Sequence, residues 1–328
     1  MLKKNFMKIS LGIFVSGVFM CLILRHINLR NSLEFIGNIN YFAFIPAVFI
    51  YAFTYILRSV RYYFIILPLK KTCIMANFPY TVLGFFANNV LPLRLGELIR
   101  AKTTGERFSI SRASALATIV MERIFDVFAL ALLFFVTIFF MSFPEFIKKS
   151  FYILTTCLVI CLVLFYIMLT YEKKILTILS KISLAKIIKL VMTKFVHKFT
   201  TGLIVLKNPT ILIKIFIISV IIWIVEALCL VVVAYACGIQ LSILGAIFTV
   251  IIIGVGAVIP AAPGYFGAFE LMGVLALYTI GIDKNIGFAC TVIYHLLQLI
   301  VIFILGFACM IKIKFSFSNL FKFSKIEQ

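Results

Sequence analysis

The sequence predicts an all-α, polytopic membrane helix bundle, and its composition is the first reason. Of the 328 residues, 64% are apolar and 13% are charged, and the mean hydropathy is +1.20. Soluble domains are about 45–50% apolar and about 25% charged. A water-soluble core of this size cannot bury such an apolar excess. We therefore exclude a soluble domain and expect one integral membrane domain over residues 1–328.

The second reason is a series of long, charge-poor runs. A hydrocarbon layer about 30 Å thick requires about 20 apolar residues in helix. The runs are continuous and do not alternate with polar residues, which favours helices over a β-barrel. No small-residue cleavage site precedes Arg25, so the first run is expected to be a retained helix and not a signal peptide. The runs are residues 9–24, 38–57, 73–91, 113–141, 150–171, 211–237, 243–259, 264–281 and 287–311.

Basic residues predict the orientation. Lys and Arg number 31 against 11 Asp and Glu, giving a formal charge of +20. By the positive-inside rule the N-terminus, the lysine-rich loop 172–210 and the short tail 312–328 are cytoplasmic. The loop 172–210 interleaves lysines with apolar residues and is expected to lie on the anionic leaflet as an amphipathic helix. Nucleic acid is not an expected partner. The same rule places a further loop in the cytoplasm, which contains Arg58, Arg61, Lys70 and Lys71.

Two pairs of runs are predicted to be re-entrant hairpins. If 73–91 crossed the membrane, the five basic residues between 94 and 112 would lie outside. A hairpin that returns through 92–100 keeps both flanks cytoplasmic. The pair 243–259 and 264–281 behaves in the same way from the outer face. The predicted bundle therefore has about six full spans and two hairpins, and the alternative is a simple bundle of eight or nine spans.

The two hairpin turns share a chemical pattern. Each has a proline, a glycine four residues later and a carboxylate just beyond, at Pro92, Gly96 and Glu97 and at Pro263, Gly267 and Glu270. Proline interrupts a helix and glycine relaxes the backbone. Broken backbone at membrane depth must be buried in protein or line a wet cavity. Inverted-repeat transporters build a central site from two such elements, and we predict this arrangement here, with two ordinary loops as the alternative.

Charges inside the apolar runs mark the candidate site. A charged side chain at the centre of a membrane helix costs about 2.5–3.5 kcal/mol on insertion scales, so it needs a partner or water. Glu122 and Asp126 lie on one face of run 113–141 and would repel each other if they were alone. Glu226 lies within 211–237 with no nearby charge in sequence. The expected partners at the hairpins are Arg94, Glu97, Arg100 and Glu270.

These charges support two interpretations. One is a polar cavity for an anionic head group, because arginine binds phosphate bidentately and helix N-termini attract anions. The other is a set of ion pairs that joins helices.

The eight cysteines form no C-x-x-C pair and are expected to be core or lipid-facing residues. No metal, nucleotide or nucleophile motif is present, so we predict no catalytic residue, metal or cofactor.

Four charged blocks follow one another along residues 8–311. They are Arg58-x-x-Arg61, Asn89-x-x-Pro92-x-Arg94-x-Gly96-Glu97-x-x-Arg100, Glu122-Arg123-x-x-Asp126 and Pro263-Gly264-x-x-Gly267-x-x-Glu270. In this order and spacing they resemble the flippase-like family, which includes the transmembrane region of lysylphosphatidylglycerol synthases. The resemblance implies an inner-membrane protein that moves or handles phospholipid or polyprenyl-linked lipid, and it makes the named residues of these blocks candidates for substrate binding.

The sequence departs from that family at two places. Only about 17 residues follow Ile311, so the soluble aminoacyl-transfer domain of bifunctional members is expected to be absent. Tyr294-His295 stands where many relatives are expected to have Tyr-Arg, and His295 is expected to be a packed helix residue.

We therefore predict a lipid translocase in which arginines attract the head group and carboxylates balance their charge. The alternatives are an intramembrane transferase similar to a phosphatidylglycerol lysyltransferase, with Glu122 and Asp126 as acid and base, and an accessory subunit of such an enzyme.

Overall fold

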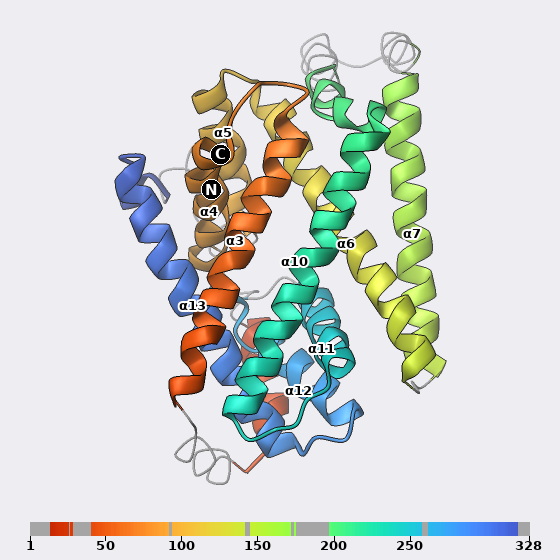
Figure 1. Cartoon of the computed structure of the whole chain (residues 1–328), viewed down its shortest axis with the longest axis vertical. Coiled ribbons are helices and arrows are strands. Elements are labelled where there is room, and N and C mark those ends of the chain that lie inside the picture. Colours follow the sequence, from red (N-terminus) through yellow and green to blue (C-terminus); the bar gives the residue numbers. More distant parts are fainter. Residues whose placement is uncertain are drawn as a thin grey trace. The chain divides into compact units, whose positions relative to one another are not determined.

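The chain folds into helices, as a computed structural model shows (Figure 1). The residues described are 14–25, 27–28, 41–91, 94–141, 145–171, 174, 197–257 and 262–320, and they contain no strand. The helices are α3 (Phe44–Ile66), α4 (Ile74–Val90), α5 (Gly96–Phe108), α6 (Arg112–Phe140), α7 (Glu145–Thr170), α10 (Pro209–Ala236), α11 (Ile243–Gly256), α12 (Ala268–Thr279) and α13 (Lys284–Lys312). A helical segment, Phe14–Leu24, precedes them, and short 3-10 turns cover Tyr41–Ala43, Ile204–Lys207 and Pro263–Tyr265. The predicted all-α class is confirmed.

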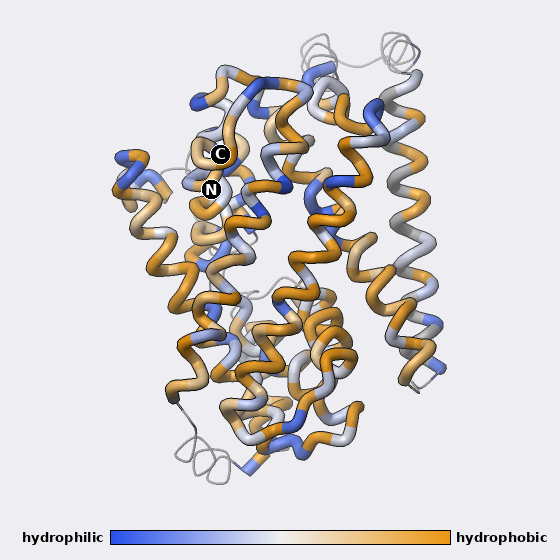
Figure 2. Tube along the Cα trace, viewed as in Figure 1, coloured by the Kyte–Doolittle hydropathy of each residue, from blue (hydrophilic) through white to orange (hydrophobic). Residues whose placement is uncertain are grey.

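Four of the described helices are long and apolar enough to cross a membrane. They are α3, α6, α10 and α13, of 23, 29, 28 and 29 residues. At 1.5 Å per residue, 20 residues already span about 30 Å, the thickness of the hydrocarbon layer. Hydrophobic residues predominate along the length of α10 (Figure 2). Large apolar side chains such as Phe139, Ile213 and Ile304 are exposed on these helices, as lipid-facing residues are. The chain is a polytopic helical bundle.

The chain divides into two compact units, and each is discontinuous in sequence. Unit 1 comprises Met1–Ile56, Val82–Ile99 and Ile221–Gln328, and unit 2 comprises Leu57–Thr81 and Arg100–Val220. The helices α3, α4, α5 and α10 each contribute one part to each unit.

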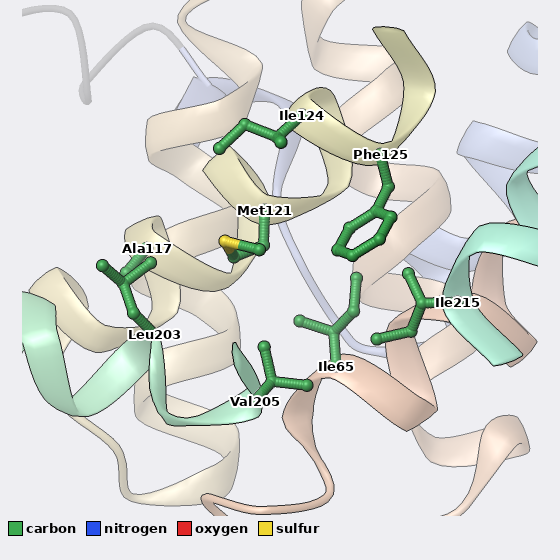
Figure 3. Close-up of a cluster of buried hydrophobic side chains, with 8 residues drawn as sticks. All are labelled: Ile65, Ala117, Met121, Ile124, Phe125, Leu203, Val205 and Ile215. Carbon is green, nitrogen blue, oxygen red and sulfur yellow. The ribbon is translucent and has the colours of Figure 1, made fainter. Parts of the chain in front are cut away.

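Unit 2 has an apolar core around α6. Met121 and Phe125 of α6 pack with Ile65 of α3, Val205 and Ile215 (Figure 3). The α6 helix begins where the Ser111 hydroxyl accepts a hydrogen bond from the backbone N–H of Ser114 at 3.0 Å, which satisfies a free donor of the first turn. The α7 helix packs against α6.

In unit 1, α12 packs against both α11 and α13. The α13 helix begins at Asp283, whose carboxylate accepts a hydrogen bond from the backbone N–H of Asn285 at 2.8 Å. After α13 the chain packs back on unit 1, because the Phe317 ring stacks against Phe307 and Leu320 is fully buried. The predicted tail 312–328 is thus packed as far as Leu320, and its remainder lies outside the described residues.

The apolar runs locate most helices, and one prediction is wrong. Run 38–57 ends too early, because α3 continues to Ile66 and buries both Arg58 and Arg61 inside the helix. The predicted cytoplasmic loop therefore does not contain these arginines. Their charges are held inside the bundle by other buried groups, which a count of apolar residues does not reveal.

The helices are interrupted at both predicted turns. The α4 helix ends at Val90 and α5 begins at Gly96, and the α11 helix ends at Gly256 and α12 begins at Ala268. The membrane face that each hairpin enters and the inverted repeat stay predictions. Most of the lysine-rich loop 172–210 lies outside the described residues, and so does the stretch of it that was predicted to be an amphipathic helix.

Candidate functional site

The two broken turns contact each other within unit 1. Arg94, in the first turn, donates a hydrogen bond from Nη2 to the carbonyl oxygen of Ala257 at 2.7 Å, across 163 residues of sequence. Its guanidinium carbon lies 6.0 Å from the centre of the Tyr265 ring in the second turn. Gly264 also lies beside the carbonyl of Asn89, at the end of α4. The prediction that the two motifs meet is therefore correct for the residues that flank Pro92, which itself lies outside the described residues.

Arg94 differs from Arg61, Arg100, Arg112 and Arg123, which each lie within ion-pair distance of a carboxylate. In the parts of the chain that the structure describes, it pairs with no carboxylate. Its hydrogen bond goes to the residue that follows α11, where the partial negative charge of a helix C-terminus favours a cation. The backbone of Arg94 is left-handed, with φ of 56°, and its side chain is partly exposed. Several of its donors therefore stay available for an oxyanion.

The second turn leads into a buried pair of ionisable side chains. Oε1 of Glu270 lies 2.6 Å from Nδ1 of His295 on α13. Oε2 of the same carboxylate accepts a hydrogen bond from the backbone N–H of Gly267 at 2.6 Å and so caps the start of α12. The imidazole stacks on Phe269, with ring centres 4.1 Å apart, and its ring centre lies 5.0 Å from that of Phe266. His295 is therefore a packed residue, as expected, and it is also the partner of a predicted site residue.

The backbone of the second turn requires glycine. Gly264 and Gly267 have φ of 74° and 84°, in the left-handed region that favours glycine. A Cβ on Gly267 would lie 2.6 Å from the carbonyl oxygen of Ser16. The Ser16 hydroxyl accepts a hydrogen bond from the N–H of Ala262 at 2.8 Å, so the segment Phe14–Leu24 packs on this turn beside Pro263.

The first turn is held by close helix packing. A Cβ on Gly96 would overlap the carbonyl oxygen of Gly84 and the backbone of Asn88, so α5 approaches α4 at this point as only glycine allows. Glu97 follows in the first turn of α5, where the helix dipole favours a carboxylate. The amide of Asn89 donates to the carbonyl of Phe85 in its own helix at 3.0 Å. Gly96 and Asn89 thus have structural contacts.

Unit 2 contains a separate ionic cluster that joins four helices. Arg61 of α3 forms a bidentate ion pair with Asp126 of α6, one bond of which, from Nη2 to Oδ2, measures 3.3 Å. Its Nη1 also donates to the Ser219 hydroxyl of α10 at 2.9 Å. Arg100 of α5 forms an ion pair with Glu122 of α6. The two arginines and the two acids are all buried.

Further contacts complete this cluster. Arg100 donates to the Thr81 hydroxyl at 3.2 Å, and its guanidinium carbon lies 4.1 Å from the centre of the Tyr62 ring, in cation–π contact. Arg61 Nη2 lies 3.7 Å from Glu122 Oε1. Arg123 lies 3.3 Å from Asp126 and is 29% exposed. Unit 2 therefore fits the interpretation of ion pairs that join helices, and Arg58 is buried in the same unit.

A comparison with known families matches the family described as the lysylphosphatidylglycerol synthase TM region over residues 9–306. The chain belongs to this family. A comparison with curated proteins finds no match. The family match and the apolar helices together make the chain an integral membrane protein related to lysylphosphatidylglycerol synthesis or lipid handling, as the motifs of the sequence implied.

Several contacts of the family motifs involve residues that sequence reasoning did not select. They are neutral residues or a lone histidine, and no charge pattern marks them: Ser16, Tyr62, Thr81, Ser219, Tyr265 and His295. The predicted residues fall into both units, with Arg94 and Glu270 in one and Arg61, Arg100, Glu122 and Asp126 in the other. A single cavity containing all of them stays a prediction.

Proposed function

We propose that this protein is a lipid translocase that moves a phospholipid, or a lipid-linked anionic head group, across the inner membrane. The single observation that carries the proposal is Arg94. It is a partly buried arginine between two broken helix ends, with hydrogen-bonding capacity that no carboxylate of the described residues uses. Phosphate is a natural ligand for such a guanidinium, because its oxygens match the planar fork of donors.

The surrounding elements support this proposal. Broken backbone within a membrane protein is tolerated where it is buried or lines a polar cavity, and transporters bind substrates at such half-helix ends. Here α4–α5 and α11–α12 bring two of these ends together at Arg94. The head group would contact Arg94 while the acyl chains stay in lipid. The basic N-terminus and tail support an orientation with both termini in the cytoplasm, where the lipid enters.

The test is translocation of phosphatidylglycerol in proteoliposomes. An acyl-labelled fluorescent phosphatidylglycerol is bleached by dithionite only in the outer leaflet, so the rate of loss of the protected fraction measures translocation. We expect Arg94→Ala to slow this rate about 10- to 100-fold, because a hydrogen bond to a charged group contributes about 1.5–3 kcal/mol.

An exposed arginine provides the matched control. The side chain of Arg112 is 65% exposed and lies 3.6 Å from the exposed Glu106, so Arg112→Ala should translocate at the wild-type rate. Size-exclusion profiles in detergent establish that both variants are folded. Wild-type rates from Arg94→Ala, or no translocation by the wild-type protein, would reject the proposal. A new lipid product, found by mass spectrometry after addition of charged tRNA, would instead identify a transferase.

A further inference from the structure

The contact of Glu270 with His295 places a proton-binding group beside the turns. In the described part of the chain, the second ring nitrogen of His295, Nε2, makes no hydrogen bond. Both oxygens of the Glu270 carboxylate already have a hydrogen-bond partner, which is the Gly267 N–H for Oε2 and His295 Nδ1 for Oε1. The pair is buried, with 4% of the histidine side chain and 3% of the glutamate side chain exposed. When Nδ1–H donates to Glu270, Nε2 is therefore the nitrogen at which the pair can bind a further proton.

The proton balance of this pair is simple. When Nδ1–H donates to an ionised Glu270, Nε2 has a lone pair and the pair has a net charge of −1. Uptake of one proton at Nε2 brings the net charge to zero and converts Nε2 from an acceptor to a donor. The first form would repel an oxyanion, and the second would offer it an N–H donor. A buried site also favours the neutral form, because an uncompensated charge is costly there.

The ring is held in place while the proton comes and goes. Phe269 stacks on the imidazole with an interplanar angle of 11°, and Glu270 is fixed by the capping bond to Gly267. Phe266, in ring contact with His295, is next in sequence to Tyr265, which lies under the Arg94 guanidinium. On the pair's own helices the other titratable or charged groups are Tyr278 of α12 and Lys284, Cys290, Tyr294, Cys309 and Lys312 of α13. The turns add Arg94 and Tyr265. Tyr51 of α3 donates to Gln298 of α13, and Tyr294 of α13 donates to the backbone carbonyl of Glu226 of α10.

We propose that Glu270 and His295 form a proton-linked site for a phosphate oxyanion, in which binding of the anion takes up one proton at Nε2. The proposal rests on the proposed function, since it supplies that function with a coupling proton. Binding linkage is reciprocal, so a lower pH strengthens anion binding and the anion strengthens proton binding.

The first experiment measures the proton directly. The chain contains only three histidines, so ring-¹⁵N-histidine labelling gives few signals, and His295→Gln assigns the one that matters. The full-length protein is placed in phosphatidylcholine nanodiscs, and spectra are recorded at a series of pH values. We expect phosphatidylglycerol to raise the fraction of His295 that is protonated at Nε2 at a fixed pH.

Two further arms of this experiment identify the source of the phosphate. Inorganic phosphate is added to phosphatidylcholine nanodiscs in one arm, and phosphatidylglycerol replaces part of the lipid in the other. A rise in the protonated fraction with phosphatidylglycerol alone assigns the site to a lipid head group, and a rise with inorganic phosphate assigns it to a soluble anion. Either rise supports the oxyanion site. A histidine signal that neither anion changes would overturn it.

Two substitutions separate proton linkage from a purely structural role. Binding of phosphatidylglycerol should strengthen up to about tenfold per pH unit as the pH falls in the wild-type protein, the limit for uptake of one proton. His295→Arg has a permanent charge and should bind at all pH values without this slope. His295→Gln stays neutral and should bind weakly, also without the slope. An unchanged slope in either folded variant would overturn the proposal.

The outcomes also distinguish this site from the proposed function. If translocation survives Arg94→Ala while phosphatidylglycerol still raises protonation of His295, the translocation mechanism is rejected and the proton-linked site is supported. If Arg94→Ala abolishes translocation while His295 does not respond to anions, the translocase stands and the proton-linked site is rejected.

Discussion

Unit 1 and unit 2 both contain buried or partly buried arginines in a lipid-facing bundle, and they use them in opposite ways. In unit 2, Arg61 has a bidentate carboxylate and a hydroxyl partner, and Arg100 has a carboxylate, a hydroxyl and an aromatic ring. In unit 1, Arg94 has one carbonyl oxygen and a more distant ring. Surroundings, and not residue type, thus separate an arginine that holds helices together from one that is available to a ligand.

The acids differ in the same way. Asp126 and Glu122 face guanidinium groups, which do not release their protons in proteins. Glu270 faces the imidazole of His295. The acids of unit 2 are therefore paired with permanent cations, whereas the partner of Glu270 is a side chain that exists in a neutral and a charged form.

The largest expected difference between the units is in stability. Arg61→Leu leaves Asp126 as a buried carboxylate without its bidentate partner, which should lower the free energy of unfolding by about 3–5 kcal/mol. Arg94→Leu removes one hydrogen bond of a partly exposed side chain and should cost about 1 kcal/mol. Reversible unfolding in mixed micelles measures both values.

A double substitution checks the cause of the loss at Arg61. Arg61→Leu combined with Asp126→Leu removes the uncompensated charge and should recover part of the stability. The comparison between the units fails if Arg94→Leu destabilises the protein as much as Arg61→Leu does.

A smaller loss is expected at the close contact of α4 with α5. Gly96→Ala places a methyl group against the carbonyl of Gly84 and should cost about 1–3 kcal/mol by overpacking. It should also slow translocation, because it displaces the turn that carries Arg94. Gly17→Ala is the matched control, since no atom lies within 4 Å of the added Cβ, and it should not destabilise the protein. Equal melting temperatures of the two variants in detergent would contradict this account of the turn.

The smallest effect is expected where the segment Phe14–Leu24 contacts the second turn. Ser16→Ala removes the acceptor of the Ala262 N–H and should cost about 0.5–1.5 kcal/mol. Faster hydrogen exchange at Ala262, measured by mass spectrometry, is the local signature. Ser316→Ala alters an exposed serine and should leave that exchange unchanged. Slow exchange at Ala262 in the Ser16 variant would show that another contact holds the turn.

The sequence predicted helices best where the apolar runs are uninterrupted. Runs 113–141, 211–237 and 287–311 correspond closely to α6, α10 and α13, because length and hydropathy alone make a membrane helix. Run 38–57 was less accurate, since α3 extends nine residues further through two arginines. Whether an arginine ends a span or is buried in it depends on partners that lie far away in sequence.

The sequence predicted the charged residues of the candidate site better than it predicted which of them pair. The charged motifs identified Arg94, Glu270 and the acids of α6, and the pairing of Arg100 with Glu122 agrees with the partners expected. The pairing of Arg61 with Asp126 and of Glu270 with His295 was not predicted. Arg61 was expected in a loop, and a lone histidine in an apolar helix is more often a packed residue than a partner.

By itself, the sequence determined the solvent in which this protein folds, the long helices, the two broken turns and the family, because these depend on composition and on local residue order. Tertiary structure alone decided which charges neutralise one another. The energy of a buried charge depends on the few atoms within hydrogen-bonding distance. Those atoms come from helices distant in sequence, so Arg61 pairs with the carboxylate of Asp126 while Arg94 donates to the carbonyl of Ala257.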